Sequence, residues 1–518
     1  MTDEQARMLL HPEAYDEPVE QVRMIQTHTS WVFLNGTHAY KVKKPVFFGF
    51  LDYKSLEARK FFCEEELRLN ERLSPDIYLG IMPVTESVGM IRIGGSGTVI
   101  DYCLQMKELP QEAIMTRKLE QHEVTFPMID EIARIVAGFH ERAATDADIR
   151  KFGGMETVKF NWDENFAQTE EFRGRTIPAT SFNAIRKAVE GFMSERGPLF
   201  RKRIRQHRIR ECHGDLHSRN IFIADRVLIF DCIEFNRRFS CCDVASEIAF
   251  FVMDLEYHGE KDLANYFVER YLALTGDWTL LQVLDFYKCY RAYVRGKVTS
   301  FNLNDSGLNA REKSAAAAIA RKYFRLAQEY ARSLDRQPAL IVMAGLPGVG
   351  KTHLATRLAQ RLNCFHLRSD IIRKELTEVP VGEHRFTGVN QGIYTSNVSA
   401  RTYEEMMGRA RKYLAAGMTV IVDATFSFAR SRDEARTMAA AADAGFLVVE
   451  CVCPVKVALA RINRRKKGFS FSDATEEVYW RIRRNFDPVK KARFAVKADT
   501  TKPLRQSLTK IESALLRR

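Results

Sequence analysis

The sequence has no cysteine pairs at the spacing of zinc or redox sites. Its ten cysteines stand singly, as Cys241-Cys242 or as Cys451-Val-Cys453, so we expect reduced, structural thiols. No uncharged apolar run approaches the ~18 residues that a membrane-spanning helix needs. The opening residues, MTDEQARMLLHPEAYDEP, lack the basic start and apolar run of a secretory signal. These absences argue against a disulfide scaffold and predict a cytoplasmic protein with no membrane partner.

Length and charge divide the chain unequally. A chain of 518 residues is too long for one ordinary core and predicts two to four domains. Residues 336–518 hold 33 Lys+Arg against 17 Asp+Glu, a net +16; the whole chain has 79 against 66, which leaves 46 against 49, a net −3, for residues 1–335. We therefore expect an anionic ligand in the C-terminal part. The boundary is placed at 335/336, because RSLDRQP ends a helical stretch and Pro338 cannot continue it.

The N-terminal part predicts an α+β domain. SWVFLNGTHAYKV contains two apolar runs around Asn35-Gly36, which is a strong hairpin signal, and MIRI and TVIDYCLQM form a second pair of runs around GGSG. Between these pairs, SLEARKFFCEEELRLNERL has helical spacing of its apolar residues. From about residue 125 to 330 the pattern is mainly helical. We therefore expect a small, sheet-bearing lobe over about 25–108 and a large lobe over about 109–335.

The C-terminal part, residues 336–518, predicts an α/β domain. Short apolar runs alternate there with helical stretches; the runs are ALIVMAG, CFHL, MTVIVDAT, FLVVECV and FAVKA. Alternation of this kind implies a mostly parallel sheet that is covered on both faces by helices.

A glycine-rich loop follows the first of these strands. GLPGVGKT fits the pattern G-x-x-x-x-G-K-[ST] and stands between the strand-like ALIVMA and the helix-like THLATRLAQRL. In such a loop the backbone N–H groups surround phosphate oxygens, Lys351 reaches the β and γ oxygens, and the Thr352 hydroxyl coordinates Mg²⁺. A chance glycine turn is the alternative. The pattern predicts ATP and Mg²⁺ as cofactors, bound by Gly345, Pro347, Gly348, Gly350, Lys351 and Thr352.

Two further segments carry a family resemblance. With the loop, RSDIIRKEL and VIVDATF make most of residues 338–518 similar to P-loop kinases of the small-molecule, polynucleotide 5′-hydroxyl and zeta-toxin-like type. The resemblance implies that Asp370 accepts the proton of the acceptor hydroxyl, that Arg373 binds substrate or phosphate, and that Asp423 lies near the metal or substrate. The alternative is that Asp370 caps a helix and Arg373 is solvated.

A basic segment, ALARINRRKKG, resembles the lid of these kinases. Arg461 and Arg465 would lie on one helical face at i,i+4, and the resemblance implies that they neutralise charge on the transferring phosphoryl group. A solvated basic helix is the alternative. The positive charge of this segment and of RIRRNFDPVKKAR also leaves nucleic acid open as a partner of the C-terminal domain.

In the N-terminal part, HGDLHSRN followed by LIFDCIEF resembles the catalytic and metal-binding loops of aminoglycoside-phosphotransferase-like kinases, which share the protein-kinase architecture. The resemblance covers roughly residues 25–330. It implies that Asp215 positions or deprotonates the acceptor hydroxyl, that Asn220 binds Mg²⁺, and that Asp231 bridges metal and nucleotide phosphates. An oriented hydroxyl and oxygen ligands for Mg²⁺ are what phosphoryl transfer mainly requires. A zinc site at His213 and His217 is the alternative, but it lacks cysteine partners.

The small lobe supplies the remaining residues of this resemblance. Lys41 in HAYKVKKP matches the lysine that contacts nucleotide phosphates, and Glu66 in EELRLNERL matches its helical partner. Two alternatives remain: Lys43 shares the strand face of Lys41, because side chains alternate with period two, and Glu65 adjoins Glu66. YCLQMKELP resembles the interlobe hinge, where the backbone around Met106 would meet adenine.

Together these segments resemble a bifunctional fusion, in which an aminoglycoside-phosphotransferase-like kinase precedes a P-loop, AAA-family kinase. The resemblance implies ATP-dependent transfer of the γ-phosphoryl group to hydroxyl acceptors at two sites. The N-terminal part has no protein-kinase GxGxxG loop, activation segment or APE motif, which favours small-molecule acceptors. The alternatives are a regulatory ATPase module, in which one domain gates the other, and a nucleic-acid 5′-hydroxyl kinase at the C-terminus. Neither the acceptors nor the oligomeric state follow from these motifs.

Overall fold

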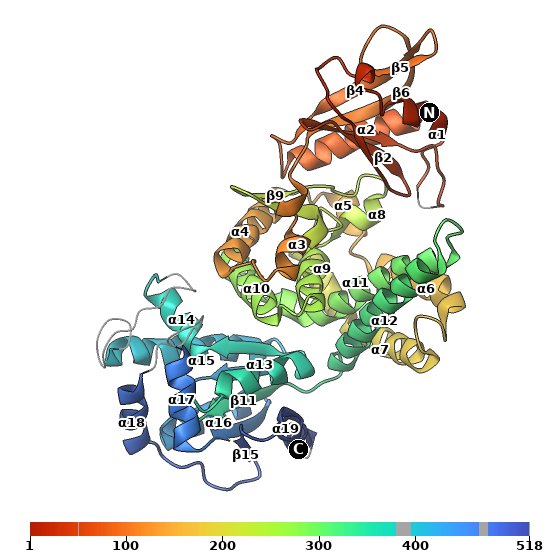
Figure 1. Ribbon diagram of the computed structural model, residues 1–518. Helices are drawn as coiled ribbons and strands as arrows, with labels where there is room; N and C mark the ends of the chain where they lie inside the picture. The colour runs from red at the N-terminus through yellow and green to blue at the C-terminus, as the bar shows by residue number, and fades with distance from the viewer. Residues whose placement is uncertain (50, 380–394, 466–474, 517–518) are drawn as a thin grey trace. The chain divides into compact units, whose positions relative to one another are not determined.

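The computed structural model describes residues 1–49, 51–379, 395–465 and 475–516, without the side chain of Arg465. The chain divides into two compact units, whose helices and strands are labelled in Figure 1. The first unit comprises Met1–Val124, Glu131–Glu164 and Arg196–Asp254. The second comprises Thr125–Asp130, Asn165–Glu195 and Leu255–Arg518. The second unit thus joins the last helices of the expected large lobe to the C-terminal sheet. The domain boundary at 335/336 stays a prediction.

An antiparallel sheet begins the first unit. Its order is β1-β2-β3-β6-β4-β5, with the bounds β1 (Arg23–Gln26), β2 (Ser30–Leu34), β3 (His38–Lys43), β4 (Tyr78–Ser87), β5 (Met90–Ile93) and β6 (Thr98–Lys107). The hairpin predicted at Asn35-Gly36 is confirmed, since β2 pairs with β3 and Gly36 has φ +92°. The two strands on either side of GGSG, β5 and β6, both pair with β4. Gly80 and Pro83, which are unfavourable in strands, weaken the sequence signal of β4.

Side chains of β3 alternate between the two faces of this sheet. Tyr40 and Val42 face a core cluster that includes Ala6 and Leu9 from α1 (Asp3–Met8) and the turn that follows it. The other face of the sheet lies against α2 (Leu56–Glu71), and from this face Lys41 and Lys43 reach Glu66. Because of this alternation, the side chains of two lysines in β3 both reach α2.

The middle of the chain is mainly helical. Its elements are α3 (Met115–Glu120), α4 (Phe126–Arg142), α5 (Ala147–Lys151), α6 (Met155–Thr169), α7 (Ala179–Arg205), β7 (Ile209–Glu211), β8 (Ile221–Ile223), β9 (Val227–Ile229), α8 (Arg237–Ser240), β10 (Cys241–Asp243), α9 (Val244–Tyr257), α10 (Lys261–Thr275), α11 (Leu281–Phe301) and α12 (Ala310–Ser333). The short antiparallel pairs β7–β10 and β8–β9 interrupt the helices where the sequence carries HGDLHSRN and LIFDCIEF. They hold both motif loops in one unit.

The C-terminal sheet has five parallel strands. Its order is β12-β13-β11-β14-β15, with the bounds β11 (Ala339–Ala344), β12 (Phe365–Arg368), β13 (Val420–Asp423), β14 (Gly445–Val452) and β15 (Ala495–Asp499). All six residues of β11 are buried, as in a central strand covered on both faces. The helices are α13 (Lys351–Leu362), α14 (Ser369–Leu376), α15 (Ser396–Ala415), α16 (Ala429–Ala441), α17 (Val455–Arg465), α18 (Glu476–Arg484) and α19 (Leu504–Leu516). The predicted classes, α+β followed by parallel α/β, are confirmed.

The strand order places the expected site at a topological switch point. From β11 the chain crosses towards β12, whereas from β13 it crosses to β14 on the other side. Ligands of open α/β sheets bind outside the carboxyl ends of strands at such a point. The loops after β11 and β13 meet there, because the Gly345 N–H donates to the Thr425 carbonyl oxygen at 3.0 Å.

Two negative expectations can be compared with the structure. All ten cysteines are free thiols and eight of them are buried, in accord with a structural role. Within the described ranges, no helix combines the length and the apolar character that crossing a bilayer requires.

Candidate active sites

The loop after β11 depends on its glycines. Gly345, Gly348 and Gly350 have φ values of +137°, +76° and +92°, a region that favours glycine. A Cβ atom at Gly345 would lie 2.5 Å from the carbonyl oxygen of Cys451, and one at Gly348 would lie 2.6 Å from that of Ala458. Other residues would therefore be both strained and in collision with the backbone of neighbouring elements.

Lys351 begins α13 and folds over this loop. Its Nζ donates to the carbonyl oxygens of Gly345 and Leu346, each at 2.9 Å. Pro347, Gly348 and Gly350 line a cavity together with Lys351. The ammonium group and the loop thus face the same space, as phosphate binding requires.

Asp423, at the end of β13, is buried beside this lysine. Its Oδ2 lies 3.3 Å from Nε2 of His366. Burial alone would raise the pKa of Asp423, but hydrogen bonds from His366 and Thr352 and the charge of Lys351 hold it below its ordinary value. Asp423 therefore stays a carboxylate, and together with the Thr352 hydroxyl it offers the oxygen ligands that Mg²⁺ prefers.

Asp370 and Arg373 lie in α14, next to β12. The N-cap of this helix is Arg368 and not Asp370, so the capping alternative does not describe Asp370. Burial raises the pKa of Asp370 above its ordinary value, and the charges of Arg373 and Arg368 oppose this shift. Arg373 is itself 7% exposed, and its Nη1 donates to Oγ of Ser399 at 3.1 Å. A carboxylate with a raised pKa is suited to take a proton.

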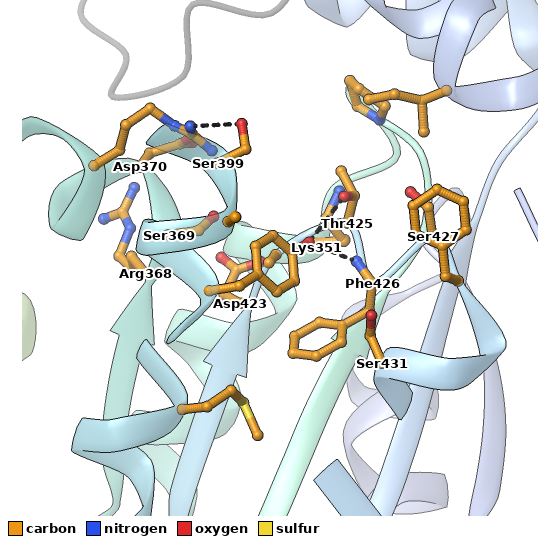
Figure 2. Close-up of a pocket in the computed structure, with 18 of the residues that line it drawn as sticks. Lys351, Arg368, Ser369, Asp370, Ser399, Asp423, Thr425, Phe426, Ser427 and Ser431 are labelled. Carbon is orange, nitrogen blue, oxygen red and sulfur yellow. Dashed lines mark hydrogen bonds between the residues drawn. The ribbon is translucent and has the colours of Figure 1, made fainter. Parts of the chain in front are cut away.

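These groups line one cavity of about 1110 Å³. Figure 2 shows Lys351, Asp423 and Thr425 between Asp370 and Ser399 on one side and Ser427 on the other. The sequence motifs missed the lining from α15, α18 and the loop after β13, which includes Ser399, Tyr403, Met407, Arg411, Phe426, Phe428 and Arg481. None of these stands at a motif spacing, so only their place in the fold identifies them.

Of the two expected lid arginines, the structure describes the side chain of Arg461 alone. Arg461 is not among the described lining residues of the cavity. Its Nη1 donates to Oγ1 of Thr500 at 2.9 Å and to the Val349 carbonyl oxygen at 3.3 Å, so Arg461 braces the phosphate loop against the end of β15. The side chain of Arg465 lies outside the described residues. Charge neutralisation by this pair stays a prediction.

In the first unit, Lys41 joins two carboxylates. Its Nζ donates to Oε1 of Glu66 and to Oδ1 of Asp231, each at 2.7 Å. Burial would lower the pKa of Lys41, but Asp231 and Glu66 raise it well above its ordinary value. Burial would likewise raise the pKa of Glu66, yet Lys41 and Lys43 lower it to about 2. Lys41 and Glu66 are therefore both charged at neutral pH.

Lys43 occupies a deeper place in the same cluster. Its side chain is 1% exposed; its Nζ donates to Oε2 of Glu66 at 2.7 Å and also contacts Glu234. Only Lys41 of these two lysines is hydrogen-bonded to Asp231 in the described structure. Glu65 pairs with Arg68 at 2.9 Å instead. Sequence reasoning missed Glu234, although it stands three residues after Asp231 in the same motif.

The loop containing Asp215 is held by several polar contacts. Nδ2 of Asn220 donates to the carbonyl oxygen of Asp215 at 3.0 Å and to its Oδ2 at 3.1 Å. Oδ2 of Asp215 also lies 3.1 Å from Nε2 of His217, and Nε2 of His213 lies 2.8 Å from the Phe230 carbonyl oxygen. Both histidines thus have hydrogen-bond partners within the loop and its neighbours, as expected of residues that support it.

Two backbone relationships complete this site. The Phe230 N–H donates to the Asn220 carbonyl oxygen at 3.1 Å, which brings the Asn220 and Asp231 segments together. Asp231 itself has φ +67°, an uncommon value for a residue with a side chain. Met106 lies near the end of β6, opposite Ala39, and packs against a small core cluster that contains Leu228. The expected metal-binding, lysine and hinge positions therefore lie in one unit.

Comparisons with known proteins agree with a C-terminal nucleotide-binding domain. A family profile described as an AAA domain matches residues 340–489. Uncharacterized proteins of Mycobacterium bovis (strain ATCC BAA-935 / AF2122/97) and Mycobacterium tuberculosis (strains CDC 1551 / Oshkosh and ATCC 25618 / H37Rv) are 32% identical to this chain over 469 residues, which cover 90% of this chain and 90% of theirs.

Similar solved structures include three kinases. A gluconokinase from Sinorhizobium meliloti has a TM-score of 0.25 at 18% identity and covers 35% of this chain and 94% of its own. The APS kinase of Mycobacterium tuberculosis in complex with AMPPNP and APS has a TM-score of 0.26 at 18% identity and covers 35% of this chain and 98% of its own. A choline/ethanolamine kinase family protein from Mesorhizobium loti has a TM-score of 0.37 at 13% identity and covers 64% and 98%.

Proposed function

The chain belongs to the family of these mycobacterial proteins, and we propose that it is an ATP-dependent phosphotransferase with two nucleotide sites. Each site transfers the γ-phosphoryl group of ATP to a hydroxyl group, on a small molecule in preference to a protein. One observation carries the proposal: the phosphate loop with Lys351 opens on the same cavity as Asp370, a carboxylate whose pKa burial raises. A donor site and a proton acceptor thus share one space.

At the C-terminal site, the loop N–H groups and Lys351 bind the phosphates of ATP. Thr352 and Asp423 would hold Mg²⁺, which neutralises charge on the phosphates. Asp370 takes the proton of the acceptor hydroxyl while the hydroxyl oxygen bonds to the γ-phosphorus. The bond between that phosphorus and the β–γ bridging oxygen breaks, and ADP leaves.

At the N-terminal site, Asp215 orients or deprotonates the acceptor hydroxyl. Lys41 binds nucleotide phosphates, and Glu66 positions Lys41 through the 2.7 Å ion pair. Asn220 and Asp231 would hold Mg²⁺, and the backbone around Met106 would contact adenine. Positioning and charge stabilisation of this kind provide most of the rate of phosphoryl transfer.

The test is an acceptor screen with γ-labelled ATP and the full-length protein. Lys351→Ala silences the C-terminal site and Asp215→Ala silences the N-terminal site. We expect each variant to lose phosphorylation of a different set of acceptors and to retain the other set. Hydrolysis of ATP without label in any acceptor would overturn the proposal.

A regulatory ATPase module is the second candidate, favoured by contacts between α10 and the C-terminal sheet. Oδ2 of Asp262 lies 3.1 Å from Nη1 of Arg368, which lines the nucleotide cavity. Arg409 of α15 joins Glu269 of α10, at 3.3 Å, to Glu375 of α14, at 2.8 Å. A change at the cavity could thus alter the packing of α10. In this case Lys351→Ala would change the N-terminal activity.

A further inference from the structure

The cavity in front of Asp370 extends away from the phosphate loop. Its outer part lies between α15, α16 and α18 and is lined by Met407, Arg411, Phe428, Met438, Arg481 and Ile482. We call these six residues the acceptor arm. Arg461 and Thr500, which flank the phosphate loop at the end of β15, are not among the described lining residues. The six residues of the acceptor arm come from segments other than the phosphate loop and α13, to which we assign the phosphates of ATP.

One wall of the acceptor arm is apolar and open. The Phe428 side chain is 56% exposed although it lines a cavity. Met407, Met438 and Ile482 line the same space. Exposed apolar surface that rims a cavity marks a binding groove more often than it marks ordinary surface. An apolar part of the acceptor would cover this wall.

The apolar surface continues beyond the cavity. A second hollow of about 950 Å³ shares Arg411, Glu434 and Met438 with the first. Ala415 of α15, Ala441 at the end of α16 and Ala442, the C-cap of that helix, line it beside the polar side chains of Arg430, Asp433 and Thr437. Met438, Ala441 and Ala442 lie on one helical face at i, i+3 and i+4. The first hollow also contains the phosphate-loop residues that we assign to ATP, so the space for an acceptor is the rest of that cavity together with the adjoining second hollow.

The charges of the acceptor arm favour an anion. Arg373 is buried at the inner end, beside Asp370, and Arg411 and Arg481 are exposed at the rim. Neither rim arginine forms a salt bridge within the described residues. Glu404 is the opposing charge at the rim, whereas Glu405 and Glu434, which also line the cavity, are paired with Arg409 and Arg430. An acidic group on the acceptor would be attracted to Arg373 at the inner end, and the charges of Arg411 and Arg481 at the rim add to this attraction.

We propose that the C-terminal acceptor is a hydroxy acid with a long apolar chain. Its hydroxyl group lies at Asp370, its carboxylate lies at Arg373 within the field of Arg411 and Arg481, and its chain covers Phe428 and continues over Ala441. The inference rests on the proposed function. The hydroxyl oxygen bonds to the γ-phosphorus of ATP, the hydroxyl proton passes to Asp370, and ADP leaves with the bridging oxygen.

The experiment compares matched acceptors with the full-length Asp215→Ala protein, in which the N-terminal site is silent. The probes are 3-hydroxybutyrate, 3-hydroxydodecanoate below its micelle concentration, the methyl ester of the latter, gluconate, and an oligonucleotide with a 5′-hydroxyl group. We expect kcat/KM for 3-hydroxydodecanoate to exceed the values for the short acid and for the ester by about tenfold or more, because buried methylene groups and the charge both favour binding.

Variants in the same background assign the preference to the acceptor arm. Phe428→Ala and Ala441→Trp should reduce the preference for the long chain; Ala441 is exposed, so the larger side chain should not disturb folding. Arg481→Ala should reduce the preference for the acid over the ester. Arg484→Ala is the control, because Arg484 is also exposed on α18 but is absent from the described lining.

The outcomes separate this inference from the proposed function. Transfer to gluconate or to the oligonucleotide without a preference for the long acid would overturn the inference and leave the phosphotransferase in place. A chain-length preference that survives both Phe428→Ala and Ala441→Trp would also overturn it. Hydrolysis of ATP with no transfer to any hydroxyl group would overturn both.

Discussion

Lys41 and Asp231 stand 190 positions apart in the sequence, and Nζ of Lys41 lies 2.7 Å from Oδ1 of Asp231. Glu66 accepts from the same Nζ atom at the same distance. The pair joins β3 of the sheet to the loop after β9. A lysine and a carboxylate in this relation can contact the phosphates and the metal of one nucleotide.

Asp231→Ala should reduce phosphoryl transfer at the N-terminal site by about 100-fold or more, because a metal ligand is lost. It should also weaken binding of Mg·ATP, as measured by calorimetry of the Lys351→Ala protein. Asp225→Ala is the control, since this exposed carboxylate on the neighbouring turn takes no part in the cluster. Unchanged transfer by the Asp231 variant would contradict its assignment.

Glu66→Ala should destabilise the protein far more than Glu65→Ala. The first substitution removes the carboxylate that two buried lysines share; Asp231 and Glu234 remain as their partners, so the loss is that of hydrogen bonds between charged groups, about 1.5–3 kcal/mol each. The second removes a surface pair with Arg68, worth about 0–1 kcal/mol. Urea unfolding of the two variants measures the difference. Equal free energies of unfolding would show that the cluster is not closed in solution.

Acid should destabilise the first unit through the same carboxylate. The pKa of Glu66 is about 2 in the folded protein against an ordinary 4.5, because its two lysines outweigh its burial. The unfolded chain therefore binds more protons between these values, so stability falls as pH decreases from about 4.5 to 2. Glu247, with a folded pKa of about 2, acts in the same direction. Glu66→Gln should flatten the pH dependence of the urea midpoint below pH 4.5.

The sequence motifs locate residues of the two candidate sites, but they do not indicate which distant residues lie beside them. Because side chains of a strand alternate between its two faces, the sequence does not distinguish Lys41 from Lys43. In the structure both lysines contact Glu66, so the choice between them is open for a physical reason. Contact with Asp231 separates them, and this depends on a segment distant in the sequence. Helical spacing places Arg461 on a face of α17 but does not indicate which element that face meets. Arg461 contacts Thr500, which directly follows β15, and this contact could be identified only from the folded structure.

The residues that form the walls of the C-terminal cavity could not be predicted from the sequence either, because only the fold brings them together. Asp370 and Lys351 belong to local motifs, whose backbone geometry short segments determine. Phe428 and Arg481 come from segments that meet only because parallel strands bring α15, α16 and α18 to one edge of the sheet. Neither residue stands at a diagnostic spacing.

Glu269→Gln should stabilise the second unit at alkaline pH. Burial raises the pKa of Glu269 to about 8, and the charges of Glu375 and Glu405 add to this effect against the attraction of Arg409. The folded protein thus binds more protons than the unfolded chain between about 4.5 and 8, so this group lowers stability as pH rises through that window. Thermal unfolding at pH 6 and pH 8.5 should show a smaller alkaline loss for the variant than for the parent protein. An unchanged loss would assign the pH dependence to other groups.

Asp370→Asn should separate nucleotide binding from transfer at the C-terminal site. Asparagine keeps the shape of the side chain but cannot take the hydroxyl proton, so we expect acceptor phosphorylation to fall by about 100-fold or more while ATP binding persists. Lys351→Ala should instead impair ATP binding, since it removes a phosphate contact. Because burial raises the pKa of Asp370, kcat/KM in the Asp215→Ala protein should decline with falling pH earlier than an ordinary aspartate would cause, and Asp370→Asn should remove this decline. Measurement of kcat/KM from pH 4.5 to 8 and of ATP binding by calorimetry checks both expectations. Full acceptor phosphorylation by Asp370→Asn would show that another group accepts the proton.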